Sequence, residues 1–211
     1  MENKILVTIA RQYGSGGREI GLRLSELLGI PLYDRELITQ TAEEGNLHPH
    51  VAERVDEKAA GSLLYTLATA TGLHGVSHTG EAHIPVNDRL FLLQSEYIRK
   101  KAAEGSGVFI GRCADYVLRD EPARFSVFVH APAEIRHERV MARHPELRPG
   151  AALDLIHKTD RRRSSYYAFY TGGKWGQCGA YHMSVDSHLF GIEGTAELIA
   201  EAVFRARASH A

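Results

Sequence analysis

The sequence predicts an α/β protein built on a mostly parallel, five-stranded sheet. Three observations lead to this prediction: a β-branched run stops at a glycine-rich turn, helical periodicity follows that turn directly, and strand and helix patterns alternate again later in the chain. A length of 211 residues with 44% hydrophobic content suits one compact domain. We therefore expect a single domain over residues 1–211.

The first 34 residues have the pattern strand, helix, strand. Residues 4–10 (KILVTIA) are apolar and rich in β-branched side chains, as in a strand buried on both faces of a parallel sheet. Apolar residues then recur at helical spacing over 20–28, and Gly29 is placed to end that helix. The spacing predicts a second strand over 30–33, after which Asp34 is a candidate N-cap of a helix running toward residue 45.

The later elements follow in order. Helices are expected over 48–70, from Asn87 to about Gly105, from Pro132 onward, through 160–170 and over 192–208. Strands are expected over 108–110, 124–130 and 181–185. The glycine- and histidine-rich stretch 71–85 has the composition of a loop.

Composition and charge exclude several classes of partner. Lys and Arg total 25 against 26 Asp and Glu, so wholesale binding of a nucleic-acid polymer is not expected. The two cysteines form no CxxC pair, and the histidines show no HExxH pattern, which disfavours a disulfide framework and a zinc site. The chain shows neither a membrane-length apolar run nor a basic-then-apolar leader, and we expect a cytoplasmic protein without membrane partners.

The most informative stretch is 11–21, RQYGSGGREIG. Glycines between a buried strand and a helix turn backbone N–H groups inward and form an anion cradle, so we expect phosphate binding by Gly14, Ser15, Gly16, Gly17, Arg18 and Glu19. Aligned on Gly17, the P-loop consensus GxxxxGK[ST] fails at three positions, where this chain has Gln12, Arg18 and Glu19. The spacing excludes a GxGxxG dinucleotide motif, and a tight turn without a ligand is the remaining alternative.

This stretch and several later segments together resemble the cytidylate kinase-like family. Beside RQYGSGGREIG and LGIPLYDRELI, the similar segments are 92–114, 128–139 (FVHAPAEIRHER), 159–176 (TDRRRSSYYAFYTGGKWG) and 185–199. The resemblance implies a three-layer P-loop kinase-type fold, with a helical acceptor-side insertion at about 34–105 and a helical lid at about 145–180. It also implies ATP- and Mg²⁺-dependent phosphorylation of a nucleoside monophosphate, CMP or dCMP.

The resemblance also implies roles for single residues. Arg18 would reach the donor phosphates in place of the usual lysine. Asp34, Arg112 and Arg136 would contact the acceptor, because an exocyclic amine needs a carboxylate and a 5′-phosphate needs forked guanidinium donors. Glu19 has two open interpretations, a Mg²⁺ ligand or an acid that favours the helix start.

The run Asp160, Arg161, Arg162 and Arg163 matches the DxxR pattern of a kinase lid, and we expect these residues and Arg18 to be catalytic. The arginine that this pattern places four residues before Asp160 is Ile156 here, so Arg161 or Arg162 is its candidate replacement. The general alternative for such a run is a solvated helix face. The neighbouring aromatic residues are expected to pack in the core.

Two further functional hypotheses remain open. The departures from the P-loop consensus also fit a non-catalytic regulator that binds a nucleotide or an anion. The stretch 46–86 has no correspondence to the family, which leaves room for a kinase with a different small-molecule acceptor. The sequence makes no prediction of the oligomeric state.

Overall fold

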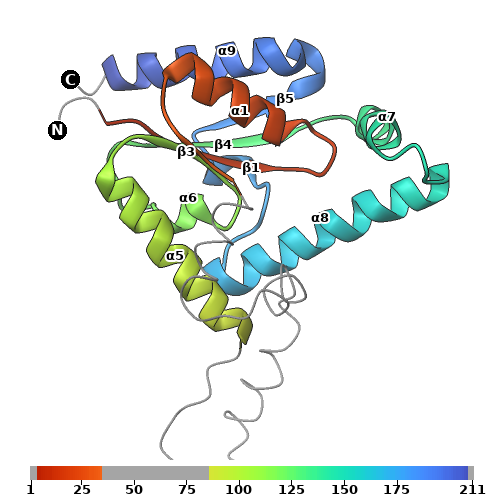
Figure 1. The fold of residues 1–211 in the computed structure, drawn as a ribbon, viewed down its shortest axis with the longest axis horizontal. Helices are drawn as coiled ribbons and strands as arrows, with labels where there is room; N and C mark the ends of the chain where they lie inside the picture. The colour runs from red at the N-terminus through yellow and green to blue at the C-terminus, as the bar shows by residue number, and fades with distance from the viewer. Residues whose placement is uncertain (1–3, 35–85, 209–211) are drawn as a thin grey trace, which may run out of the picture.

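The computed structural model describes residues 4–34 and 86–208, and this part of the chain forms a sheet between two layers of helices (Figure 1). The strands are β1 (Leu6–Arg11), β2 (Leu32–Tyr33), β3 (Gly107–Ile110), β4 (Arg124–His130) and β5 (Met183–Asp186). They pair in the order β2-β3-β1-β4-β5, and every pair is parallel. The predicted α/β class and five-stranded sheet are confirmed.

Strand β1 lies at the centre of the sheet because it is apolar on both faces. Leu6 pairs with Gly107 of β3 on one side and with Arg124 of β4 on the other. Val7 and Ile9 face one core cluster, whereas Leu6 faces a second cluster on the opposite side of the sheet. The carboxyl end of β1, at Arg11, therefore meets the ends of β3 and β4 at one edge, where ligands bind in open α/β sheets.

Two helices cover one face of the sheet. Figure 1 shows α1 (Gly17–Leu28) and α9 (Ser187–Ala208) side by side above the strands. Ile20 and Leu24 of α1 meet Ile199 and Val203 of α9 in the larger core cluster. Because β1 leads directly into α1, this packing fixes the loop that joins them.

The other face is covered by α5 (Val86–Glu104) and the short α6 (Ala114–Val117), as Figure 1 shows. The long helix α8 (Pro149–Thr171) lies on the same side, and α7 (Ala133–Arg143) leads into it. Val140 of α7 packs on Ala152 and Ile156 of α8. The first half of α8 is thus anchored to α7, and the second half extends beneath the sheet.

Some predicted boundaries differ from the structure. Helix α5 begins at Val86, so Asn87 lies in its first turn and is not its cap. Helix α7 begins at Ala133 with Pro132 as its N-cap, so it starts one residue later than predicted. Helix α9 begins at Ser187, with a kink at Gly191 where the backbone is left-handed. The helices expected over 34–45 and 48–70, and the loop 71–85 with its histidines, lie outside the described residues.

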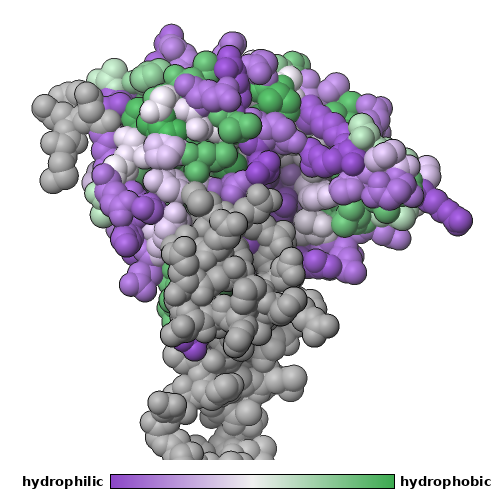
Figure 2. Space-filling view, in the orientation of Figure 1, coloured by the Kyte–Doolittle hydropathy of each residue, from purple (hydrophilic) through white to green (hydrophobic). Residues whose placement is uncertain are grey.

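The described surface is mixed. Figure 2 shows hydrophobic residues over α1 and α9 and mostly hydrophilic residues around the far end of α7 and α8. The exposed large apolar side chains include Leu22, Leu27 and Phe204 on these two upper helices. Within the described ranges, no helix combines the length and the apolar character needed to cross a bilayer.

Candidate functional site

The glycine loop joins β1 to α1 and depends on two left-handed glycines. Gly14 has φ 79° and Gly16 has φ 80°, values that side chains other than glycine adopt only with strain. A Cβ on Gly14 would lie 2.8 Å from the carbonyl oxygen of Arg136, and one on Gly16 would collide with Ile192. The loop is therefore tight against α7 and α9, and its backbone N–H groups can approach an anion closely.

An ion pair between α7 and α8 holds the first half of this loop. The Asp160 carboxylate accepts a hydrogen bond from the Tyr13 backbone N–H at 2.7 Å and one from the Arg136 guanidinium at 2.6 Å. Arg136 also donates to the Tyr13 carbonyl oxygen at 3.3 Å. Both charged side chains are largely buried, so removing either one would leave the other without compensation.

A second contact holds the other half of the loop. The buried Ser187 hydroxyl donates to the Ser15 carbonyl oxygen at 2.6 Å, and Arg139 donates to the same oxygen at 3.1 Å. Arg139 also donates to the Ser187 hydroxyl oxygen at 2.9 Å. The loop is thus fixed by α7, α8 and the start of α9, which pre-organises it for a ligand.

The helix start changes the register of the P-loop comparison. Gly16 is the N-cap of α1 and the last left-handed residue of the loop, so Gly17 is the first helical residue. Aligned on Gly16, the consensus lysine position falls on Gly17 and the consensus first glycine falls on Arg11. Arg18 then takes the position of the consensus Ser or Thr. The alignment on Gly17 that the sequence alone suggested differs from this one by one residue.

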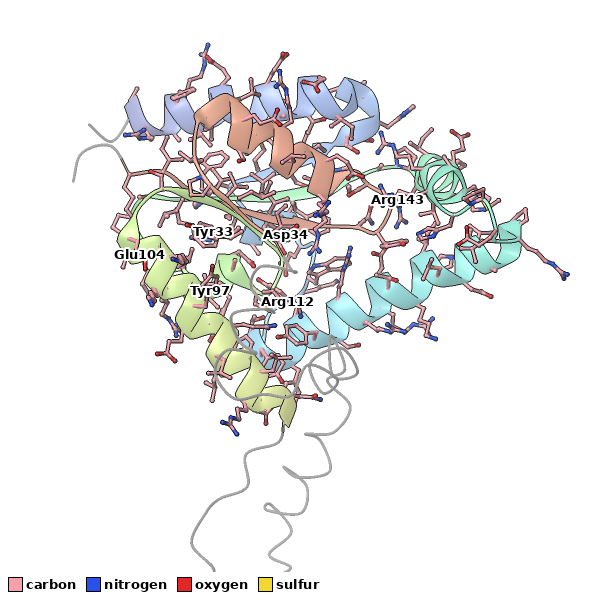
Figure 3. All side chains as sticks on the ribbon, viewed as in Figure 1. Tyr33, Asp34, Tyr97, Glu104, Arg112 and Arg143 are labelled. Carbon is pink, nitrogen blue, oxygen red and sulfur yellow. The ribbon has the colours of Figure 1, made fainter. Side chains whose placement is uncertain are left out.

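Arg18 and Glu19 both point away from the loop. The Arg18 guanidinium, 62% exposed, donates to the Asp34 carboxylate with N–O distances of 3.0 Å and 2.8 Å. Glu19 forms an ion pair with Arg143 of α7. Figure 3 shows Arg143 near the start of α1, whereas Asp34 lies toward Arg112 on the other side of the loop. The structure thus brings Arg18 together with a predicted acceptor residue.

The turn after β3 is strained. Gly111, Arg112 and Cys113 are three consecutive residues with left-handed backbone, at φ values of 73°, 55° and 53°. This conformation costs a residue with a side chain roughly 1–2 kcal/mol. The turn directs Arg112 inward, where only 8% of the residue is exposed. Strain of this kind is typical of functional sites, and here it places a cation beneath the sheet edge.

Three arginines from three elements line a pocket at this edge. Arg11 ends β1, Arg112 follows β3 and Arg163 comes from α8, and all three border the pocket beside Asp115, Tyr167 and Trp175. Arg163 donates to the Arg11 carbonyl oxygen at 3.0 Å. The free volume is about 30 Å³, which suits a group the size of one or two waters. Such a cationic site is suited to a phosphate oxygen.

The other predicted lid and acceptor residues lie elsewhere. Arg161 and Arg162 are exposed on α8, and Ile156 is buried against α7. Arg136 lies behind the glycine loop with Asp160, so the structure does not bring it to Arg112. The DxxR pattern therefore separates into two contacts: Asp160 holds the loop, and Arg163 borders the pocket.

The aromatic residues of α8 pack in the protein, as the sequence predicted. Phe91 of α5 stacks on Tyr170 with ring centroids 4.1 Å apart, and the Tyr170 hydroxyl donates to Asp88 at 2.9 Å. Tyr166 and Tyr167 are buried in the same cluster as Cys113. This packing joins the second half of α8 to α5 and forms the pocket wall opposite the sheet.

A buried carboxylate lies beside the arginines. The Tyr167 hydroxyl donates to Asp115 at 2.7 Å, and only 7% of Asp115 is exposed. Burial raises the pKa of the Asp115 carboxyl, and the Tyr167 hydrogen bond and the Arg124 charge offset this only in part. The folded protein therefore keeps the Asp115 proton to a higher pH than the unfolded chain does.

This raised pKa predicts that Asp115 destabilises the folded protein as pH rises. Because the pKa of Asp115 is higher in the folded protein than in the unfolded chain, the unfolding free energy falls as pH rises between these two values. Above the folded pKa this loss of unfolding free energy is complete. We expect Asp115→Asn to gain stability over the wild type as pH rises above about 4, by about 1.4 kcal/mol for each pH unit that separates the folded pKa from the unfolded pKa.

The measurement is urea unfolding of both proteins from about pH 4 to about pH 8. Tyr167→Phe is the matched control, because it removes a hydrogen bond that lowers the Asp115 pKa and should extend the loss of stability to higher pH. Parallel curves for Asp115→Asn and the wild type would contradict the prediction.

Sequence reasoning missed three residues that contribute to the glycine loop or the pocket. Arg11 was interpreted only as the polar end of a strand, although a strand end beside a glycine loop is a site position. Ser187 lies in the family segment 185–199, but nothing in the sequence predicts its contact with Ser15. Asp115 follows the Gly-Arg pair by three residues, and its burial depends on the strained turn.

Comparison with known proteins identifies the family and the fold. The cytidylate kinase-like family model matches residues 6–189. An uncharacterized protein from Eubacterium ventriosum is similar in structure, with 27% identity and a TM-score of 0.71 over 96% of this chain and 99% of that one. Shikimate kinase from Bacteroides thetaiotaomicron shares the fold, with 13% identity and a TM-score of 0.53 over 95% of this chain and 99% of that one.

No curated protein matches the sequence. The family match nevertheless spans most of the chain and includes the glycine loop, the turn after β3 and helix α8. On this evidence the protein belongs to the cytidylate kinase-like family and is a kinase-type phosphotransferase.

Proposed function

We propose that the protein transfers the γ-phosphoryl group of ATP to the phosphate of CMP or dCMP. In this reaction the bond between the γ-phosphorus and its bridging oxygen breaks, and an oxygen of the acceptor phosphate bonds to that phosphorus. The products are ADP and the nucleoside diphosphate. The acceptor phosphate attacks as a dianion, so no protein base is needed, and catalysis depends on positioning and charge stabilisation.

One observation carries the proposal: arginines from β1, the turn after β3 and α8 border one pocket at the end of β1, the strand that leads into the glycine loop. Phosphoryl transfer spreads negative charge over the migrating group, and cations fixed around it lower the barrier. In a pocket this small the arginines would contact phosphate oxygens, and the nucleosides would lie outside it. The family match supports the same reaction class.

Donor and acceptor would approach this pocket from two sides. We assign the donor phosphates to the loop formed by Gly14, Ser15, Gly16 and Gly17, whose glycines permit close backbone approach. We assign the acceptor phosphate to Arg112, a buried residue that follows β3 in the strained turn and borders the pocket. Arg163, from the lid helix, would lie between the two phosphates.

Asp34 would give the acceptor site its preference for cytosine. A carboxylate accepts a hydrogen bond from the exocyclic amine of cytosine, which uracil lacks. The carboxylate follows β2 on the side of the glycine loop where Arg112 lies (Figure 3). Arg18 holds it at 2.8 Å, which orients the carboxylate oxygens.

Magnesium would enter with ATP. Within the described ranges, no group of three His, Cys, Asp or Glu side chains forms a metal site. Glu19, the acidic side chain at the start of α1, is already paired with Arg143, and so it fits a ligand role only if that pair opens. Mg²⁺ commonly keeps its waters and binds through substrate phosphates, and the residues present fit that mode.

The test is ADP release with MgATP against CMP, dCMP, UMP, AMP and GMP. We expect turnover that depends on CMP or dCMP and is at least about 10-fold slower with UMP. Binding of ATP without turnover on any nucleotide would contradict the proposal and favour a non-catalytic regulator. Turnover with a different phosphate acceptor would support kinase activity but overturn the assignment of CMP or dCMP as the acceptor.

Asp34→Asn tests the base preference directly. An amide presents donors as well as an acceptor, and so it can pair with the uracil carbonyl oxygen that a carboxylate repels. We expect the ratio of kcat/KM for CMP to that for UMP to fall by about 10- to 100-fold. Asp154→Asn, an exposed change on α8, is the control. An unchanged ratio in Asp34→Asn would remove Asp34 from the site.

A further inference from the structure

The glycine loop lacks a lysine, and the structure shows which side chain occupies the corresponding space. Aligned on Gly16, the consensus GxxxxGK requires glycine at position 11 and lysine at position 17, whereas this chain has Arg11 and Gly17. The two residue types are thus exchanged between the end of β1 and the start of α1. An exchange of this kind keeps one cation and one glycine in the loop.

The path of the Arg11 side chain explains the exchange. A Cβ on Gly17 would lie 2.6 Å from the Arg11 Cβ and 2.7 Å from its Cγ. The aliphatic part of the Arg11 side chain therefore occupies the space where the side chain of a lysine at position 17 would begin. Further along, the Arg11 guanidinium lies against Gly111, where a Cβ would collide with Nη1. Two glycines from different elements therefore make room for this one side chain.

The end of that path is the arginine-lined pocket. Arg11 borders it with Arg112 and Arg163, and the Arg163 contact with the Arg11 carbonyl oxygen fixes the backbone from which the side chain starts. Arg18, the cation that the sequence suggested, is directed to Asp34. The two arginines therefore serve different sides of the loop.

We propose that Arg11 is a catalytic residue that replaces the P-loop lysine, with Gly17 retained to let its side chain cross the helix start. The inference deepens the proposed function and rests on it. Arg11 would contact the β- and γ-phosphates of ATP and neutralise the charge that develops as the γ-phosphoryl group leaves. A guanidinium forms two parallel hydrogen bonds to phosphate, so it holds the donor in a defined orientation.

The exchange itself supplies the experiment. Arg11→Gly combined with Gly17→Lys restores GxxxxGK across positions 11–17, and the carbonyl oxygen that Arg163 contacts remains. Arg11→Met removes the cation, and Gly17→Lys alone places a Cβ against the Arg11 stem. Arg99→Met, an exposed change on α5, controls for loss of any arginine. The readouts are calorimetric binding of MgATP, acceptor turnover and thermal unfolding.

We expect Arg11→Met to weaken MgATP binding by at least about 10-fold and turnover by at least about 100-fold, with an unchanged melting temperature. Gly17→Lys alone should lose binding and stability. The double variant should bind MgATP at least about 10-fold more tightly than Arg11→Met does, which corresponds to about 1.4 kcal/mol. Arg18→Met should weaken MgATP binding less than Arg11→Met does.

Three results would overturn the inference: MgATP binding by Arg11→Met equal to that of the wild type, a greater loss in Arg18→Met, or no recovery in a folded double variant. Binding of MgATP requires no acceptor, so a wild type that binds MgATP but phosphorylates no nucleotide would refute the proposed function and still decide the role of Arg11. A wild type that binds no MgATP would overturn both.

Discussion

Replacing Arg112 by alanine is expected to lower kcat/KM for CMP by at least about 100-fold, because the variant loses the guanidinium assigned to the acceptor phosphate. Arg112→Gly should lose the same activity. The two variants should differ in stability, since Arg112 has φ 55° and glycine adopts this conformation without a Cβ penalty. We expect the glycine variant to be more stable than the alanine variant by about 1 kcal/mol.

Kinetics with CMP, MgATP calorimetry and urea unfolding check this prediction together. MgATP binding should change much less than kcat/KM for CMP, which separates the acceptor site from the donor site. Arg119→Ala is the matched control, because Arg119 is exposed in the same segment and packs on the Tyr116 ring. Full activity in Arg112→Ala would remove Arg112 from the reaction, and equal stability of the two variants would contradict the strain assigned to the turn.

Asp160→Ala is expected to reduce both stability and ATP binding. The change leaves Arg136 without its 2.6 Å partner and the Tyr13 backbone N–H without its acceptor. Breaking one side of a buried ion pair costs about 3–5 kcal/mol, and the lower end applies here because the Asp160 side chain is 17% exposed. Since the same contact fixes the glycine loop, we expect MgATP affinity to fall by about 10-fold.

A double-mutant cycle separates the ion pair from general damage to α8. Arg136→Met with Asp160→Ala should be more stable than the sum of the single changes predicts, by at least about 1 kcal/mol, because the uncompensated charge is gone. Asp154→Ala on the exposed side of α8 should be neutral within about 0.5 kcal/mol. Strict additivity of the two changes would show that Asp160 and Arg136 do not stabilise the loop as a unit.

Local patterns in the sequence were sufficient for most of the fold. The β-branched run before the glycines predicted β1, and the predicted strand 124–130 coincides with β4. Helix α1 ends at Gly29 as expected, because glycine adopts the left-handed conformation of a C-cap at little cost. The short helix α6 has no periodic pattern of its own, since it depends on the strained turn that precedes it.

The site was less predictable because its contacts join distant segments. The family resemblance indicated Arg112 and Arg163, and both border the pocket. It also indicated Arg136, whose side chain turns to Asp160 and the glycine loop, a choice that periodicity along α7 cannot reveal. The register of the loop depends on which glycine is left-handed, and a sequence with Gly16 and Gly17 in succession does not specify that.

The central position of β1 has a consequence for how the chain acquires its structure. Strand β1 pairs with β3 at Gly107 and with β4 at Arg124, both about a hundred residues later in the chain. It therefore leaves the ribosome well before both of its neighbours. Until then this apolar strand has two open edges, a condition that favours association with other chains. We expect the nascent N-terminal half to depend on chaperone protection, and β1 to pair with both neighbours only when the second half of the chain is made.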